Sequence, residues 1–183
     1  APDLEVTETI TTTMITEAFC DRCLIGRWEA TNDSMKAYMQ SAGVAGEAAG
    51  PEIMSVVGSM LMRFDGIGLG SSTYDNLSVR EKGAGNIEGV DVIVMLAGSA
   101  IGRYSADGSD LIAFTDTSNI RLSVEIFLNG KSLGESVDTL GPEDLLIRPG
   151  IPTRYTCEGD TLTTWPPVEG VTVEPIVWVR ASP

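Results

Sequence analysis

From Arg63 to its end, the chain is a succession of short segments rich in β-branched and aromatic residues, and this succession limits the folds open to it. The segments are separated by sequences that favour tight turns, such as Asp107-Gly108, Asn129-Gly130 and Glu158-Gly159-Asp160. Tight turns need residues that accept a positive φ, as glycine, asparagine and aspartate do. Many short strands joined by hairpins, without βαβ alternation, predict an antiparallel barrel or sandwich and disfavour a Rossmann-type fold.

The expected strands follow a short first strand at Gly26–Ala30. They are Met62–Leu69, Tyr74–Glu81, Val90–Leu96, Ala100–Ser105, Leu111–Thr115, Ile120–Leu128, Leu145–Ile147, Thr153–Glu158, Thr161–Trp165 and Ile176–Arg180.

Between the first strand and this β region, residues 34–62 have the pattern of a helical insert. Asn32-Asp33-Ser34 is a helix-start signal, because side-chain oxygens there can accept from the free N–H groups of a first turn. The apolar residues that follow at helical spacing are Met35, Tyr38, Met39 and Ala42. A second helix is expected to begin at Pro51, with an apolar stripe made by Ile53, Met54, Val57, Met60 and Leu61.

Charge and residue types exclude several functions. The 183 residues include 12 Lys+Arg against 26 Asp+Glu, a net charge of −14, which repels nucleic acid and anionic lipid. There are no histidines, which removes Ser-His and Cys-His catalysis and histidine metal ligands. No stretch approaches the roughly 20 apolar residues of a membrane span. Glu29 and Glu125 are acid–base candidates only if buried, so we expect no catalytic residue, metal or cofactor.

Three cysteines are present, and the chain opens on Ala1-Pro2-Asp3 without an initiator methionine. Cys20 and Cys23 have C-x-x-C spacing, but the second pair of a zinc ribbon is missing. We expect a disulfide from Cys157 to either Cys20 or Cys23, closing a loop worth roughly 4–5 kcal/mol at most in the chain-entropy model. A disulfide and a signal-peptidase-like start both predict a secreted or cell-surface protein.

Residues 1–19 are expected to form an amino-terminal strand arm ahead of the main domain, residues 20–183. Its apolar side chains lie on even positions, one face of an extended strand: Leu4, Val6, Ile10 and Met14. Such an arm can pair with its own barrel or add a strand to a neighbouring copy. Addition that does not close into a ring builds a filament.

Several short motifs resemble those of bacterial lipocalin-like (calycin) domains. Gly26-Arg27-Trp28 is similar to the G-x-W signature of the first barrel strand, and Tyr155–Thr163 to a late hairpin with the pattern Tyr-x-Cys-x-Gly-Asp-Thr-Leu-Thr. Trp178-Val179-Arg180 is similar to the final strand. The resemblance implies a single antiparallel barrel over residues 24–181, closed at one end by Arg180 packing across Trp28.

The resemblance also implies an apolar ligand, and the methionine-rich insert supports a lid over its pocket. Thioethers adapt to irregular ligands, although the same methionines can fill the barrel's own core. The residues expected near the pocket or its cap are Trp28, Tyr38, Met39, Met54 and Met60, with Met35 beside them in the insert. We therefore expect an extracytoplasmic, non-enzymatic binding protein for a small hydrophobic molecule. The alternative is a filament subunit whose partners are copies of itself.

Overall fold

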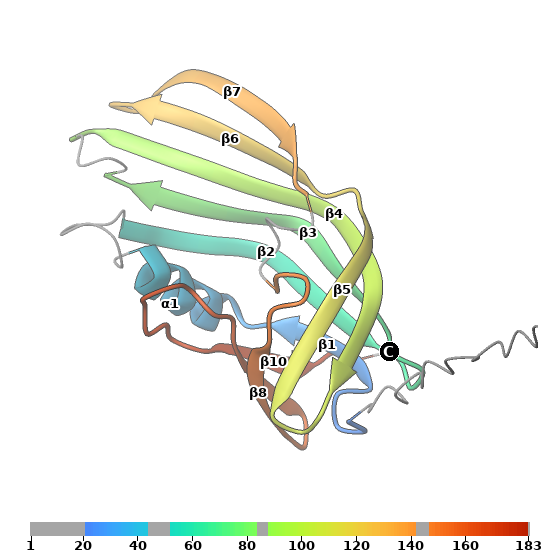
Figure 1. The fold of residues 1–183 in the computed structure, drawn as a ribbon. Helices are drawn as coiled ribbons and strands as arrows, with labels where there is room; N and C mark the ends of the chain where they lie inside the picture. The colour runs from blue at the N-terminus through green and yellow to red at the C-terminus, as the bar shows by residue number, and fades with distance from the viewer. Residues whose placement is uncertain (1–20, 44–51, 84–87, 142–146, 183) are drawn as a thin grey trace, which may run out of the picture.

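The computed structural model describes residues 21–43, 52–83, 88–141 and 147–182. This part of the chain is mainly β, with one helix after the first strand (Figure 1). Its elements are β1 Gly26–Ala30, α1 Asn32–Gly43, β2 Glu52–Phe64, β3 Leu69–Lys82, β4 Val90–Ala106, β5 Asp110–Ser118, β6 Arg121–Leu128, β7 Lys131–Thr139, β8 Thr153–Glu158, β9 Thr161–Trp165 and β10 Ile176–Arg180.

Eight antiparallel strands close into a barrel in the order β3-β2-β1-β10-β9-β8-β5-β4, and pairing of β4 with β3 completes the circle. The long strand β4 changes partner along its length: Val90–Ala97 pairs with β6, and Ala100–Ala106 pairs with β5. The β6–β7 hairpin therefore extends the sheet beside the barrel. At this end the wall opens into a curved sheet, with α1 lying under β2 (Figure 1).

The barrel fold confirms the architecture expected from the strand and turn pattern. Its core is continuous, and each fully buried indole has a hydrogen-bond partner, which offsets the cost of burying its N–H group. The Trp28 N–H donates to the Leu24 carbonyl at 2.7 Å, and the Trp178 N–H donates to the Thr164 hydroxyl at 2.9 Å. The predicted hairpin at Asn129-Gly130 is present with positive φ at both residues.

The expected helical insert is only partly correct. Helix α1 begins after Thr31, whose hydroxyl accepts a hydrogen bond from the Ser34 N–H at 3.4 Å. The second predicted helix, from Pro51 to residue 62, is wrong, since residues 52–64 are strand β2. Register shifts after Ile53 and after Val57 insert extra residues, so the buried side chains of β2 begin at Ile53, Val56 and Met60. That spacing of three and then four matches a helix, which misled the sequence interpretation.

Several strand predictions also need correction. The predicted strand Met62–Leu69 contains the turn between β2 and β3, and the predicted strands Val90–Leu96 and Ala100–Ser105 are parts of the single strand β4. Strand β7 was not expected, because all nine of its residues are exposed and it has no alternation of apolar and polar types. The predicted strand Leu145–Ile147 is not seen at Ile147, which lies in a bend and packs against the core; Leu145 falls outside the described residues. Ile147 therefore packs against the hydrophobic core and does not pair with a strand of the sheet.

The cysteine prediction is confirmed and its open choice is resolved. Cys23 is bonded to Cys157, with 6.0 Å between their Cα atoms, and this links the segment before β1 to β8. Cys20 and the arm residues Leu4, Val6, Ile10 and Met14 lie outside the described residues. As for membrane spans, none of the described helices has the length and apolar character to cross a bilayer.

Candidate functional site

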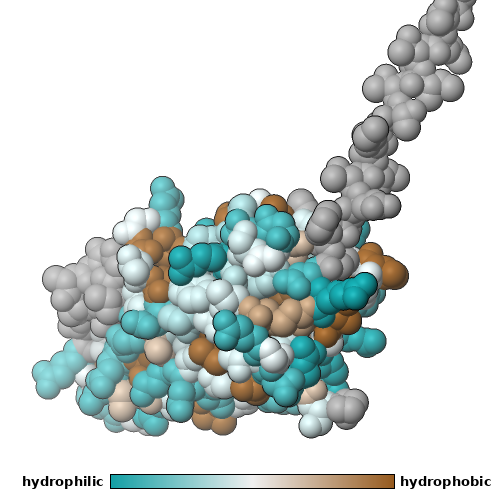
Figure 2. Space-filling model, turned by 90° about the horizontal axis from the view of Figure 1, so that it is seen from below, coloured by the Kyte–Doolittle hydropathy of each residue, from teal (hydrophilic) through white to brown (hydrophobic). Residues whose placement is uncertain are grey.

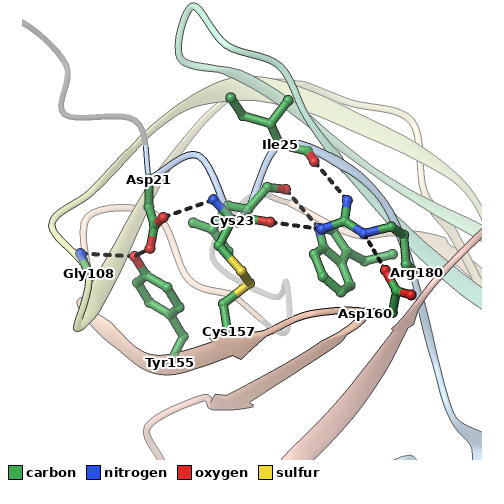
Figure 3. The surroundings of a disulfide bond; sticks show 10 residues. Asp21, Cys23, Ile25, Gly108, Tyr155, Cys157, Asp160 and Arg180 are labelled. Carbon is green, nitrogen blue, oxygen red and sulfur yellow. Dashed lines mark hydrogen bonds and ion pairs between the residues drawn. A yellow bond between two sulfur atoms is a disulfide. The ribbon is translucent and has the colours of Figure 1, made fainter.

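The closed end of the barrel is fixed by Arg180. Its guanidinium carbon lies 4.2 Å from the centroid of the Trp28 ring, so the contact expected from the motif resemblance is present. The same guanidinium donates to the Ile25 carbonyl at 2.9 Å and to the Cys23 carbonyl at 3.1 Å (Figure 3). It also pairs with the exposed Asp160 at 3.1 Å. A buried ring under a fully engaged cation has no free surface for a ligand, so this end is structural.

A second set of contacts at the same end surrounds the disulfide. The Tyr155 hydroxyl donates to the Asp21 carboxylate at 2.7 Å and accepts from the Gly108 N–H at 2.9 Å (Figure 3). Burial, and then the bond to Asp21, raise the pKa of Tyr155, so its hydroxyl stays protonated at neutral pH. These contacts hold residues 21–25 against the turn between β4 and β5 and against β8.

The interior of the closed barrel is nearly filled by its own side chains. One cavity of about 60 Å³ lies along β2, β3, β4 and β5. The side chains that matter most for its shape are Met60, Phe64, Tyr74, Tyr104, Leu111 and Ile147. Ligand pockets for small molecules measure about 300–1,000 Å³, so this cavity is too small for a carrier's ligand.

The open end carries the larger apolar surface. Side chains at even positions of β4 and β6 lie on the inner face of the curved sheet, because they share cross-strand rows with the buried Leu77 and Val79 of β3. We call this set the concave apolar face: Val90, Val92, Val94, Leu96, Leu122, Val124, Ile126 and Leu128.

The concave apolar face is built in ordered rows. One row consists of four valines on four neighbouring strands, Val56, Val79, Val94 and Val124, and the row beside it of Leu77, Leu96 and Leu122. Burial falls along the rows, from the core at β2 and β3 to the partly exposed β6, where Ile126 keeps 41% and Leu128 39% of its surface exposed. Seen from below, as in Figure 2, the molecule has hydrophobic residues scattered among hydrophilic ones.

One carboxylate interrupts these rows. Glu81 of β3 stands in the row Ile53, Glu81, Val92, Ile126, so its side chain shares the inner face with aliphatic neighbours on both sides. It is half-buried, and burial raises the pKa of its carboxyl above the usual range.

The five residues expected at the pocket lie in different surroundings. Trp28 is fully buried at the closed end, and Tyr38 is buried where α1 meets the core, where burial raises its pKa. Met39 is half-buried against the core, and Met54 is 42% exposed at the first irregularity of β2. Met60 lines the small cavity. Met35 of α1 is buried with the core. The sequence left open whether the methionines form a lid over a pocket or fill the barrel core, and Met35 and Met60 pack in the core.

The concave apolar face itself was missed at the sequence level, although a signal exists. Val90, Val92, Val94 and Leu96 fall on even positions of one expected strand, and β6 repeats this pattern from Leu122 to Leu128. Alternation of this kind places each set on one face of its strand. What the sequence does not reveal is that β4 and β6 pair in a register that joins the two sets.

Within the described ranges, no group of three or more acidic or cysteine side chains is placed to hold a metal ion. The carboxylates Glu29 and Glu125 are each only partly buried. Asp107, at the predicted hairpin turn, is exposed, and hydrogen bonds from the Asp110 and Ser109 N–H groups lower its pKa. That carboxylate organises a turn.

Comparisons of the chain with protein-family models, with curated proteins and with solved structures found no match in any of the three. The fold and the residues described above therefore carry the functional argument.

Proposed function

We propose that the chain is a non-enzymatic binding protein of lipocalin-like type, which holds a small apolar molecule against the concave apolar face at the open end of its barrel. The observation that carries this proposal is the set of eight aliphatic side chains aligned on β4 and β6 in a chain of net charge −14. Covering such a surface is favourable by about 25 cal/mol for each Å² of apolar area removed from water.

The closed and open parts of the barrel differ in the room that they leave for a ligand, and this difference supports the open end as the binding site. The closed part retains only about 60 Å³, whereas β6 and β7 of the described sheet lie outside the closed circle of strands. An extracytoplasmic location is part of the proposal and is supported by the Cys23–Cys157 disulfide, since such bonds persist in oxidising compartments.

Binding is tested with the neutral dye N-phenyl-1-naphthylamine, whose fluorescence rises in apolar surroundings. Val124 lies on the concave apolar face and Val57 is 60% exposed on the opposite face, so Val124→Asp and Val57→Asp form a matched pair. We expect wild type and Val57→Asp to enhance the fluorescence and Val124→Asp to lose the enhancement. The nearly isosteric Val124→Thr, which keeps the shape of the side chain, should show a partial loss. Equal enhancement by all four proteins would refute the proposal.

A filament subunit is a second candidate, and one observation favours it. In the described sheet β7 is the last strand and has no neighbour on its outer edge, which is where an added strand would pair. However, β7 carries Glu135, Asp138 and an irregularity at Gly134, and the predicted arm is itself acidic. Like charges at a new strand pair are destabilising, so this candidate is weaker than ligand binding.

Deletion of residues 1–18 separates the two candidates. A filament subunit forms polymers that light scattering detects, and these polymers disappear on deletion. A binding protein keeps its size and its dye binding after the same deletion.

A further inference from the structure

Glu81 is a charged side chain with aliphatic cross-strand neighbours on both sides, an unusual setting for a carboxylate. The other charged residues in the aliphatic rows described above, Asp138 beside Leu122 and Lys131 beside Leu128, lie on the outermost strand β7. On the strand of Glu81 the residues of the same face are Leu77 and Val79, both buried. Across the strands it faces Ile53 on one side and Val92 on the other. The basic residues beside it in sequence, Arg80 and Lys82, have the opposite parity and belong to the outer face.

Within the described ranges, no cation forms an ion pair with this carboxylate. All twelve Lys and Arg residues belong to the described ranges, and the ion pairs found there join Arg80 to Asp91, Arg103 to Asp116 and Arg180 to Asp160. The nearest element across from β2, helix α1, offers Lys36, but its ammonium group donates to the Met54 carbonyl at 3.0 Å. Among the described residues Glu81 has neither a hydrogen bond nor an ion pair.

A half-buried carboxylate without a partner loses part of its hydration and gains no compensating contact. A ligand with a cationic nitrogen at Glu81 would give the carboxylate an ion pair. An alkyl or aryl group of the same ligand along β4 and β6 would cover the concave apolar face. Charge-assisted hydrogen bonds of this kind are stronger than neutral ones. The acidic chain as a whole also attracts cations at long range.

We propose that the ligand is a cationic amphiphile, an alkyl or aryl amine, whose ammonium group pairs with the Glu81 carboxylate while its apolar part covers the concave apolar face. This inference rests on the proposed function and adds the chemical class of the ligand.

The test compares octylamine, octanol and octanoate as probes, with affinities measured by calorimetry on the full chain. Octanol reports on the apolar face alone. Octylamine should bind about tenfold or more tightly than octanol, as one charge-assisted hydrogen bond in a partly desolvated site requires, and octanoate more weakly than octanol. In Glu81→Gln the affinity for octylamine should fall to about the affinity for octanol, while the affinity for octanol should stay within about twofold of the wild-type value.

The matched control is Glu125→Gln, which removes the same charge from the outer face of β6. It should keep the preference for octylamine, because both variants lower the net charge equally and only Glu81→Gln removes the carboxylate that pairs with the amine. Equal binding of amine and alcohol by wild type would overturn the inference while leaving the proposed function intact. A preference that survives in Glu81→Gln would also overturn it. If none of the three probes binds, the proposed function fails first and the inference fails with it.

Discussion

Arg180 packs so closely over Gly26 that a side chain at position 26 would clash with it: a Cβ added at Gly26 would lie 2.5 Å from Nη1 of Arg180. Gly26 has φ +133°, a conformation that other residues rarely adopt. The guanidinium passes over this position to lie on the Trp28 ring. A glycine two residues before the tryptophan and an arginine on the last strand are thus parts of a single contact.

Arg180→Ala should therefore lower the free energy of unfolding by about 2–3 kcal/mol, because it removes the cation–π contact and the hydrogen bonds to two backbone carbonyls. Urea denaturation measures this directly. Arg154→Ala is the control, since Arg154 also lies over a ring, Trp165 at 4.3 Å, but is exposed. Its loss should cost less than about 1 kcal/mol. Equal costs would show that burial and the carbonyl contacts are unimportant.

The disulfide joins residues separated by 134 positions in sequence. The chain-entropy model gives about 4–5 kcal/mol for closing a loop of this length, as an upper value. The double variant Cys23→Ser, Cys157→Ser should lose about 3–4 kcal/mol, whereas Cys20→Ser should match wild type and remain sensitive to reductant. Urea unfolding with and without dithiothreitol distinguishes them. A large loss in Cys20→Ser would contradict the observed pairing.

Gly98 marks the point where β4 leaves β6 and joins β5. Its φ is +126°, and an added Cβ would lie 2.5 Å from the Asn119 carbonyl oxygen. Gly98→Ala should cost about 2 kcal/mol or more, from backbone strain together with this clash. Gly108→Ala has a positive φ but no atom within 4 Å of the added Cβ, and should cost about 1 kcal/mol. Thermal melts compare the two, and a reversed order would contradict the proposed role of Gly98.

Glu81 also predicts a pH dependence of stability. Its pKa is raised in the folded chain, so the folded state binds this proton more tightly than the unfolded state does. The stability it contributes is fully present below the ordinary glutamate pKa of 4.5 and is lost as the pH rises through the raised value. Glu81→Gln should therefore gain stability relative to wild type as the pH increases through this window. Parallel stability curves of the two proteins would contradict a raised pKa of the half-buried Glu81 carboxyl.

The barrel and its hairpins could be predicted from sequence because their signals are local, whereas the Arg180–Trp28 contact at the closed end was expected only from the motif resemblance. Asn129-Gly130 specifies a turn by its own backbone preferences, and the motif around Trp28 fixes a short strand. Strand β2 could not be predicted, because its two irregularities give Ile53, Val56 and Met60 the spacing of a helix. Only pairing with β3, a tertiary effect, decides between the two structures.

The candidate site was harder to predict for a related reason. The alternation in β4 and in β6 is visible in sequence, but which faces meet depends on a register set by non-local pairing. The position of Glu81 among valines and isoleucines is likewise a property of four paired strands. Met54, which we expected near the pocket or its cap, is 42% exposed at an irregularity of β2, a position that its residue type does not reveal.

The measurement that tests the central claim most directly is a methyl NMR titration of the full chain, labelled at Ile, Leu and Val, with octanol. We predict that shifts concentrate on the concave apolar face, with Val92, Val94 and Val124 as reporters. Val57 and Val137, exposed on the outer face, should not move. Shifts of equal size on both faces, or shifts confined to the small cavity at Leu111, would contradict the claim that this face binds the ligand.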